Sequence, residues 1–147
     1  MNLFDLLLNC KFNLKMMTVT TPVQIRFADV DKLGHVNNAV YLSYIELARM
    51  DFFSKVGGEI DWSKKGVIVG RIEINYKMPV LLDDNIIVKT WCSRIGNKSF
   101  DLSYSIIKIN NGTETEVVNA ISVLVCYNYV EKKSIEIPDQ WKTWLTK

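Results

Sequence analysis

The segment between residues 38 and 57 constrains the fold of this chain more than any other stretch. Apolar side chains cover almost every direction around its helical axis, and only Ser43, Glu46 and Arg49 leave a narrow polar stripe. A helix that is apolar on nearly its whole circumference is expected to be buried. The pair Gly57-Gly58 follows, and a glycine in the left-handed conformation is typical just after the C-terminus of an α-helix. We therefore predict one long buried helix that ends there.

The rest of the chain is rich in stretches with the composition and alternation of β-strands. The predicted strands are 18–27, 66–70, the alternating stretch 71–77, 86–91, 99–109 and 117–129. Asn111-Gly112, a pair favoured by type I′ turns, predicts a tight hairpin between the last two. These elements predict an α+β fold: a single domain whose antiparallel sheet of about five to six strands wraps around the helix. The edge strands of such a sheet are often closed by homodimerisation.

The composition excludes several classes of protein. The chain has 147 residues, of which 48% are hydrophobic, so it is long enough and apolar enough to form one folded domain. A formal net charge of +2 without a basic run argues against nucleic-acid binding. One histidine and three cysteines without a CxxC pair argue against a metal centre or a disulfide framework. We interpret Cys92 and Cys126 as reduced strand residues of a cytoplasmic protein.

Residues 1–17 precede the predicted domain, which covers residues 18–147. Asp5 and Asn9 interrupt the apolar residues of this segment, and no basic residue precedes them. The segment is therefore a poor secretory signal, and it is too short to span a bilayer. Two interpretations stay open: a short amphipathic extension that packs on the domain, or sequence upstream of a true start at one of the two methionines before the first strand.

The loop ahead of the helix gathers polar groups that can do chemistry. Between residues 29 and 38 it contains Asp29, Asp31, the single histidine His35 and the pair Asn37-Asn38. A helix start presents unpaired backbone N–H groups and a dipole that favours negative charge. Either asparagine can serve as the N-cap of the helix. Taken alone, the aspartates can equally be turn formers, and a lone histidine is more often structural than catalytic.

This stretch resembles a known family. The motif reads Phe27-Ala-Asp29-Val-Asp31-Lys-Leu-Gly34-His35-Val36-Asn37-Asn38-Ala-Val-Tyr41, followed by Glu46-Leu-Ala-Arg49, and it resembles the hotdog-fold acyl-CoA thioesterases of the 4-hydroxybenzoyl-CoA thioesterase type. Supporting similarity continues through Arg71-Ile-Glu-Ile-Asn-Tyr76-x-x-Pro79 and Lys98-Ser99-Phe100, and the whole covers roughly residues 19–138. The resemblance implies a hotdog fold and the hydrolysis of an acyl thioester.

The resemblance implies that Asp31 is catalytic, as a nucleophile or as a general base. It implies that His35 and Asn37 position the substrate or a water molecule. A thioester carbonyl is a good electrophile, so one carboxylate and one group that polarises the carbonyl can suffice. Backbone N–H groups of Gly34 or of residues 37–39 are the candidates for that group. No cofactor or metal is implied, because coenzyme A is part of the substrate.

The resemblance also implies a set of substrate-binding residues. These are Gly34, Asn38, Tyr41, Arg94, Lys98 and Ser99. The last three form a basic corner that would meet the CoA phosphates. The pair Gly96-Asn97 stands where some relatives have arginines, so this nucleotide site is expected to be weaker or shifted. Glu46 is a reserve carboxylate, because other hotdog thioesterases use an acidic residue of the central helix, and otherwise it is expected to pair with Arg49.

Three functions stay open at this level. The leading hypothesis is a homo-oligomeric acyl-CoA thioesterase, either a dimer or a homotetramer built from two dimers. The second is a hotdog enoyl-CoA hydratase or dehydratase, since Asp31 and His35 superficially match its acid and histidine. The third is a non-catalytic protein that binds acyl thioesters. The sequence does not define the acyl group, which can be aromatic, medium-chain or long-chain, or whether CoA or a carrier protein bears it.

Overall fold

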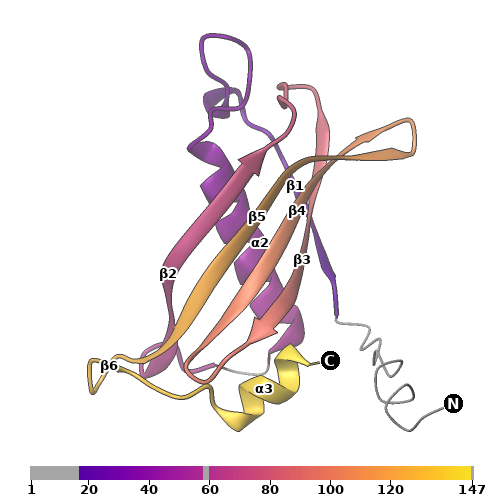
Figure 1. Cartoon of the computed structure of the whole chain (residues 1–147). Helices are drawn as coiled ribbons and strands as arrows, with labels where there is room; N and C mark the ends of the chain where they lie inside the picture. Colours follow the sequence, from indigo (N-terminus) through magenta and orange to yellow (C-terminus); the bar gives the residue numbers. More distant parts are fainter. Residues whose placement is uncertain (1–16, 58–59, 147) are drawn as a thin grey trace, which may run out of the picture.

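The computed structural model describes residues 17–57 and 60–146, so residues 1–16 of the predicted extension lie outside the described part. Its elements are β1 (Val19–Val23), the 3₁₀ turn η1 (Phe27–Asp29), α2 (Val40–Val56), β2 (Lys65–Tyr76), β3 (Asn85–Ile95), β4 (Ser99–Asn110), β5 (Thr113–Asn128), β6 (Lys133–Ser134) and α3 (Asp139–Leu145). Figure 1 shows the long helix α2 lying across one face of the curved sheet. The predicted α+β architecture is confirmed.

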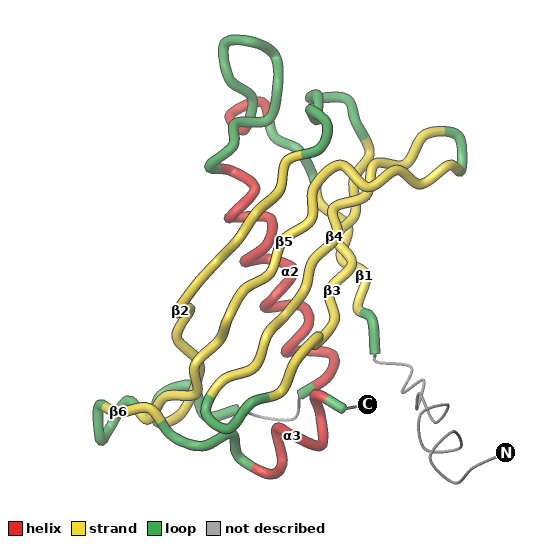
Figure 2. The backbone as a smooth tube through the Cα atoms, viewed as in Figure 1, coloured by secondary structure: helices red, strands yellow, loops and turns green. Residues whose placement is uncertain are grey.

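The strands form one antiparallel sheet in the order β1-β3-β4-β5-β2, and the short β6 pairs with β5 (Figure 2). β4 and β5 build the long hairpin that the sequence predicts. Asn111 and Gly112 at its tip have φ values of 48° and 80°, as a type I′ turn requires. β1 and β2 form the two edges of the described sheet.

The first strand is shorter than predicted. β1 ends at Val23, and the chain turns at residues 27–29 instead of continuing as a strand. The cause is Asp29, whose carboxylate accepts the Arg26 backbone N–H at 2.9 Å and the Arg26 Nη2 at 2.8 Å. These bonds close a tight turn, and Phe27 is left 85% exposed.

The helix α2 is buried on one face only. The residues buried on this face are Tyr41, Tyr44, Ile45, Ala48, Arg49, Phe52, Phe53 and Val56. On the opposite face Leu42, Leu47 and Met50 are 43%, 50% and 50% exposed. The prediction of burial on nearly the whole circumference is therefore wrong for this chain, because the sheet covers α2 from one side. Arg49, assigned from the sequence to the polar stripe, lies on the buried side.

Neither end of α2 has the predicted cap. Ala39 is the N-cap residue, and Asn37 instead accepts the Ala39 N–H at 3.0 Å through its side-chain Oδ1. At the other end Gly57 is extended, with φ −85° and ψ 156°, rather than left-handed. A close approach explains the glycine, because a Cβ there would lie 2.8 Å from the Phe53 carbonyl oxygen. Gly58 lies outside the described residues.

The strand β2 joins the two predicted stretches 66–70 and 71–77 into one. A bulge between Val69 and Arg71 shifts its register against β5, which explains why the alternation changes at that point. Ile72 and Ile74 are half-buried, so the apolar face of this alternating stretch is only partly covered. β2 pairs only with β5 among the described strands, and its other edge is open.

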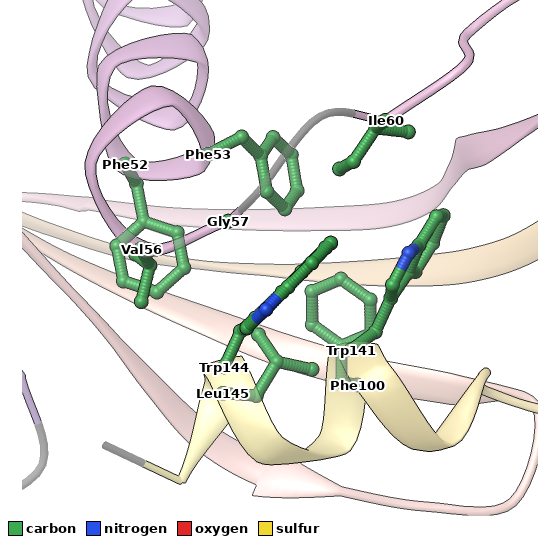
Figure 3. A pocket seen from close by; sticks show the side chains of 9 residues that line it. All are labelled: Phe52, Phe53, Val56, Gly57, Ile60, Phe100, Trp141, Trp144 and Leu145. Atoms are coloured by element: carbon green, nitrogen blue, oxygen red, sulfur yellow. The ribbon is translucent and has the colours of Figure 1, made fainter.

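The C-terminal segment packs under the far end of α2. Trp141 and Trp144 both lie on α3, and their rings stack with centroids 6.4 Å apart. Together with Phe52, Phe53 and Phe100 they line a small apolar pocket, shown in Figure 3. This cluster closes the core at the end of α2 that is opposite the polar loop.

Candidate active site

The polar loop before α2 folds back on itself. The Asp31 N–H donates to the His35 carbonyl at 2.8 Å, and the Gly34 N–H donates to the Asp31 carbonyl at 3.0 Å. Gly34 has φ +82°, a conformation that glycine adopts without strain. The Val36 N–H then donates to the Val80 carbonyl at 2.8 Å, which ties the loop to the segment after β2. The loop is therefore a defined turn with backbone bonds at both ends.

Asp31 has one engaged and one available carboxylate oxygen. Its Oδ1 accepts the Leu33 N–H at 2.8 Å and the His35 N–H at 3.4 Å. Among the described residues no donor bonds to Oδ2. A groove of about 350 Å³ opens at this carboxylate, lined by Asp31, His35, Val36, Asn38, Tyr41, Tyr76, Lys77, Met78 and Pro79. The turn thus holds Asp31 in place while it leaves one oxygen for a ligand.

Asp29 is in the opposite situation. It is 1% exposed, and besides Arg26 it accepts the Tyr44 hydroxyl at 2.8 Å. The side-chain hydrogen bond from Arg26 is the main cause that lowers the pKa of the Asp29 carboxyl. Burial, together with the bond to Asp29, raises the pKa of Tyr44. With its carboxylate fully engaged, Asp29 anchors the loop start to α2.

The backbone N–H groups at the helix start are almost all occupied. Gly34 donates to Asp31, Asn37 donates to the Asp29 carbonyl at 2.9 Å, and Ala39 donates to the Asn37 side chain. Of the candidate donors that the sequence offered, Asn38 alone has an N–H for which the described residues provide no acceptor. Asn38 lines the same groove as Asp31. Asp31, which has an unbonded carboxylate oxygen, and Asn38, which has an available N–H, therefore line the same cavity.

Two tyrosines form the wall of this groove. Tyr41 is 3% exposed, and its ring meets the Tyr76 ring edge-on, with centroids 5.3 Å apart. Burial raises the pKa of the Tyr41 hydroxyl. The Tyr76 hydroxyl donates to the Asn38 carbonyl at 2.9 Å. The sequence prediction placed Tyr41 in the site. It used Tyr76 only as a strand residue and as part of the supporting similarity, because nothing local to β2 shows that it reaches the helix start.

His35 and Asn37 also lie in this loop, and their side chains differ in the hydrogen bonds that they make. His35 lines the groove beside Asp31, and its imidazole makes no hydrogen bond with the described residues. The side-chain oxygen of Asn37 is occupied by the Ala39 N–H. Asn37 therefore shapes the turn into α2, which is a structural contribution independent of any contact with substrate.

The basic corner predicted to bind CoA phosphates lies at the other end of the sheet. β3 starts beside Leu81, which bridges to His35, and runs for 11 residues, roughly 35 Å, to this corner (Figure 1). Arg94 is held there by Asp101, with Nε–Oδ2 and Nη2–Oδ1 distances of 2.7 Å and 2.8 Å. Its Nη2 also lies 3.4 Å from the Ser99 Oγ, and Lys98 is exposed. One chain does not bring these residues to Asp31.

The predicted ion pair of Glu46 and Arg49 is present, with a long distance between the charged groups. Their Oε1 and Nη2 atoms are 3.9 Å apart, with the Glu46 side chain 69% exposed and the Arg49 side chain 11% exposed. Glu46 lies outside the set of residues that line the groove at Asp31. The carboxylate that this chain places at the groove is Asp31.

The chain is similar in sequence and in fold to known thioesterases. Residues 25–145 match the family model of the thioesterase-like superfamily. The long-chain acyl-CoA thioesterase FadM of Escherichia coli K12 is 28% identical over 120 residues, covering 80% of this chain and 89% of FadM. A thioesterase of Thermus thermophilus, solved with coenzyme A and zinc, is 32% identical with a TM-score of 0.74, covering 86% of this chain and 96% of its own.

A 4-hydroxybenzoyl-CoA thioesterase mutant, solved with 4-hydroxybenzoyl-CoA, superposes with a TM-score of 0.80 at 20% identity, covering 87% of this chain and 98% of its own. At that identity the likeness establishes the hotdog fold. The class defined by fold and site is thus the hotdog thioesterases. The chain belongs to the thioesterase-like superfamily, and the family predicted from the motif is confirmed. In the described parts of the chain, no helix is long and apolar enough to cross a membrane.

Proposed function

We propose that this protein hydrolyses acyl-CoA thioesters to a free acid and coenzyme A, with Asp31 as its catalytic carboxylate. The observation that carries the proposal is that Asp31, whose Oδ2 is unbonded, and Asn38, whose N–H is available, line one groove. Hydrolysis of a thioester needs a nucleophile or base on one side of the carbonyl carbon and a donor to its oxygen. The named relatives are thioesterases, which supports the same reaction class here.

The chemistry balances with these groups alone. In one route Asp31 Oδ2 attacks the carbonyl carbon, the C–S bond breaks, CoA leaves as a thiolate, and water hydrolyses the acyl–aspartate anhydride. In the other route Asp31 takes a proton from a water molecule that attacks the same carbon. In both routes negative charge develops on the carbonyl oxygen, where the Asn38 N–H and the start of α2 stabilise it. Neither route requires a cofactor.

The remaining groove residues have supporting roles in this proposal. His35, beside Asp31, orients the thioester or the attacking water. Tyr41 shapes the groove wall near the reacting carbon. Gly34 acts outside the groove lining, because its N–H bond to the Asp31 carbonyl closes the turn that holds Asp31. The roles of Arg94, Lys98 and Ser99 toward the CoA phosphates require a neighbouring chain, because within one chain they lie at the far end of the sheet.

We propose a homo-oligomer built on the open edge of β2. This edge strand is 12 residues long, and its apolar residues Ile68 and Val69 are 41% and 38% exposed. An exposed apolar edge is a template for pairing with another strand. Antiparallel pairing of two β2 strands would bring the basic corner of one chain to the same end of the assembly as Asp31 of the other. Two such dimers would form the homotetramer.

Buried free thiols at Cys92 and Cys126 are compatible with a cytoplasmic enzyme.

The deciding experiment measures release of free CoA thiol from short, medium, long and aromatic acyl-CoAs by the wild type and by Asp31→Asn. We expect turnover by the wild type and a loss of at least about 100-fold in kcat for the variant. Asp61→Asn is the matched control, because Asp61 Oδ1 accepts the N–H two residues ahead, as Asp31 does, but lies outside the groove. Equal kcat for Asp31→Asn and wild type would refute the mechanism.

The same panel, extended by an enoyl-CoA and by a binding measurement, separates the other hypotheses. An absorbance change on an enoyl-CoA without thiol release would indicate a hydratase. Tight binding of acyl-CoA without turnover would indicate a binding protein or an acyl carrier protein as the natural thiol. Each of these outcomes would contradict hydrolysis of acyl-CoA as the function.

A further inference from the structure

The geometry points to Tyr76 as a positioning residue that fixes the Asn38 peptide for catalysis, an inference that rests on the proposed function. Tyr76 lies at the end of β2, far from Asn38 in sequence, and its hydroxyl donates to the Asn38 carbonyl at 2.9 Å. This bond spans from the edge strand to the helix start. It is the contact by which the sheet holds the residue whose N–H remains available in the groove.

The orientation of the Asn38 N–H depends on the two peptide groups that meet at this residue. A peptide unit is planar, so fixing its carbonyl also fixes the direction of its N–H. The carbonyl of Asn37 belongs to the same peptide plane as the Asn38 N–H, and it accepts the Val40 N–H at 2.9 Å. The following peptide is held by Tyr76 at its carbonyl and by the Asn37 side chain at its N–H.

Loss of the Tyr76 bond would allow the peptide plane between Asn38 and Ala39 to rotate more freely. Three hydrogen bonds fix these two peptide planes. The bond from Tyr76 to the Asn38 carbonyl is the one that comes from an element distant in sequence, since the other two lie within residues 37–40. A small rotation about the Asn38 backbone would move its N–H away from the developing oxyanion. Misplacement by about 1 Å can reduce a rate by roughly 100-fold.

Tyr76→Phe removes this bond and keeps the ring, which forms an edge-on contact with Tyr41 in the groove wall. Tyr129→Phe is a matched control, because the Tyr129 hydroxyl donates to the Val67 carbonyl at 3.1 Å, near the other end of β2. We expect kcat of Tyr76→Phe to fall about tenfold or more while KM stays within about twofold. Tyr129→Phe should keep both values of the wild type.

A second readout follows the Asn38 amide directly. We would label the protein with ¹⁵N and add a non-hydrolysable ketone analogue of the acyl-CoA, or a thioether analogue that lacks the carbonyl. In the wild type and in Tyr129→Phe the ketone should move the Asn38 amide proton signal, and the thioether should not. In Tyr76→Phe the ketone should produce a smaller shift.

The outcomes keep the two claims apart. If the wild type hydrolyses acyl-CoA and Asp31→Asn does not, but Tyr76→Phe has the kcat of Tyr129→Phe, the inference about Tyr76 is overturned and the proposed function stands. If no variant hydrolyses any acyl-CoA, the proposed function fails, and the amide signal decides the inference alone. Equal ketone-induced shifts in all three proteins, or none in any, would overturn it.

Discussion

At the scale of single residues, two aspartates that look alike in the sequence have opposite environments. Asp29 is buried and accepts hydrogen bonds from Arg26 and Tyr44, whereas Asp31 keeps one oxygen unbonded at a groove. A carboxylate with all acceptor sites engaged holds a backbone in place, and one with a free oxygen can react. The two-residue spacing explains the division, because the tight turn at residues 27–29 directs the first inward and the second to the groove.

Asp29 predicts how stability depends on pH. Its pKa is lowered in the folded state, so the unfolded chain binds more protons at acidic pH. The stabilisation from this group is therefore fully present above the ordinary aspartate pKa of about 3.9 and is lost as the pH falls below it. We expect Asp29→Asn to lower the free energy of unfolding by about 2 kcal/mol at pH 7 and to flatten its pH dependence between about pH 5 and pH 2.

Urea unfolding across that pH range measures this effect. Asp139→Asn is the control, because the Asp139 side chain is 99% exposed and pairs only with Lys142 in the described structure. An Asp29→Asn curve that runs parallel to the wild-type curve down to pH 2 would show that Asp29 contributes nothing through its charge.

At the scale of elements, the site is the junction of three segments. α2 provides the helix start, the loop of residues 30–36 provides Asp31, and the end of β2 provides Tyr76. The loop is held to the segment after β2 by the bond from Val36 to Val80. The long hairpin of β4 and β5 has a structural role instead, since it provides two inner strands of the sheet against which the core packs.

The tip of that hairpin makes a prediction at the same scale. Gly112 has φ +80°, and a Cβ added there would meet no other atom within 4 Å, so only its backbone conformation opposes a side chain. Gly112→Ala should therefore lower the free energy of unfolding by about 1 kcal/mol. Gly112→Asn should cost clearly less, because asparagine tolerates this region better. Thermal unfolding of the two variants gives the comparison, and equal melting temperatures would contradict a left-handed residue at the tip.

At the scale of the whole molecule, the two ends of the sheet carry different groups. Asp31, His35 and Tyr76 lie at the end where α2 begins, and the basic corner with Lys98 lies at the end where α2 stops (Figure 1). One chain alone therefore separates the proposed catalytic groups from the basic groups predicted to meet CoA. An antiparallel partner along β2 is the simplest way to bring both kinds of group to each end of the assembly.

The proposed assembly is open to a direct test. Ile68→Lys places a charge on the exposed edge strand β2 and should convert the dimer to monomers, measured by sedimentation or light scattering. Ile121→Lys is the control, because Ile121 is similarly exposed, 42% against 41%, but lies on β5, inside the sheet. We expect Ile121→Lys to retain the β2 dimer. A dimer unaffected by Ile68→Lys and lost in Ile121→Lys would place the interface on the sheet face instead.

Features that depend only on neighbouring residues were predictable from the sequence. Strand alternation, the Asn111-Gly112 turn and the apolar periodicity of α2 are local patterns, and they correctly gave the α+β fold, the hairpin and the helix. The motif around Asp31 gave the family, which the match over residues 25–145 confirms. The resemblance to that family named Asp31, His35, Asn38 and Tyr41 as site residues. All four line one groove, because they lie within or beside one short loop.

Which of these groups keep an unbonded atom depends on contacts between segments that are distant in the sequence. Whether Asp29 or Asp31 keeps a free oxygen depends on Tyr44, one helix turn into α2, and on the turn at Arg26. The sequence could not show that Arg49 is buried, because the side of α2 that faces the sheet is fixed by packing over β1 and β3. Tyr76 reaches Asn38 through a contact across 38 residues. Such contacts follow from how the sheet curves around the helix, which no local pattern encodes.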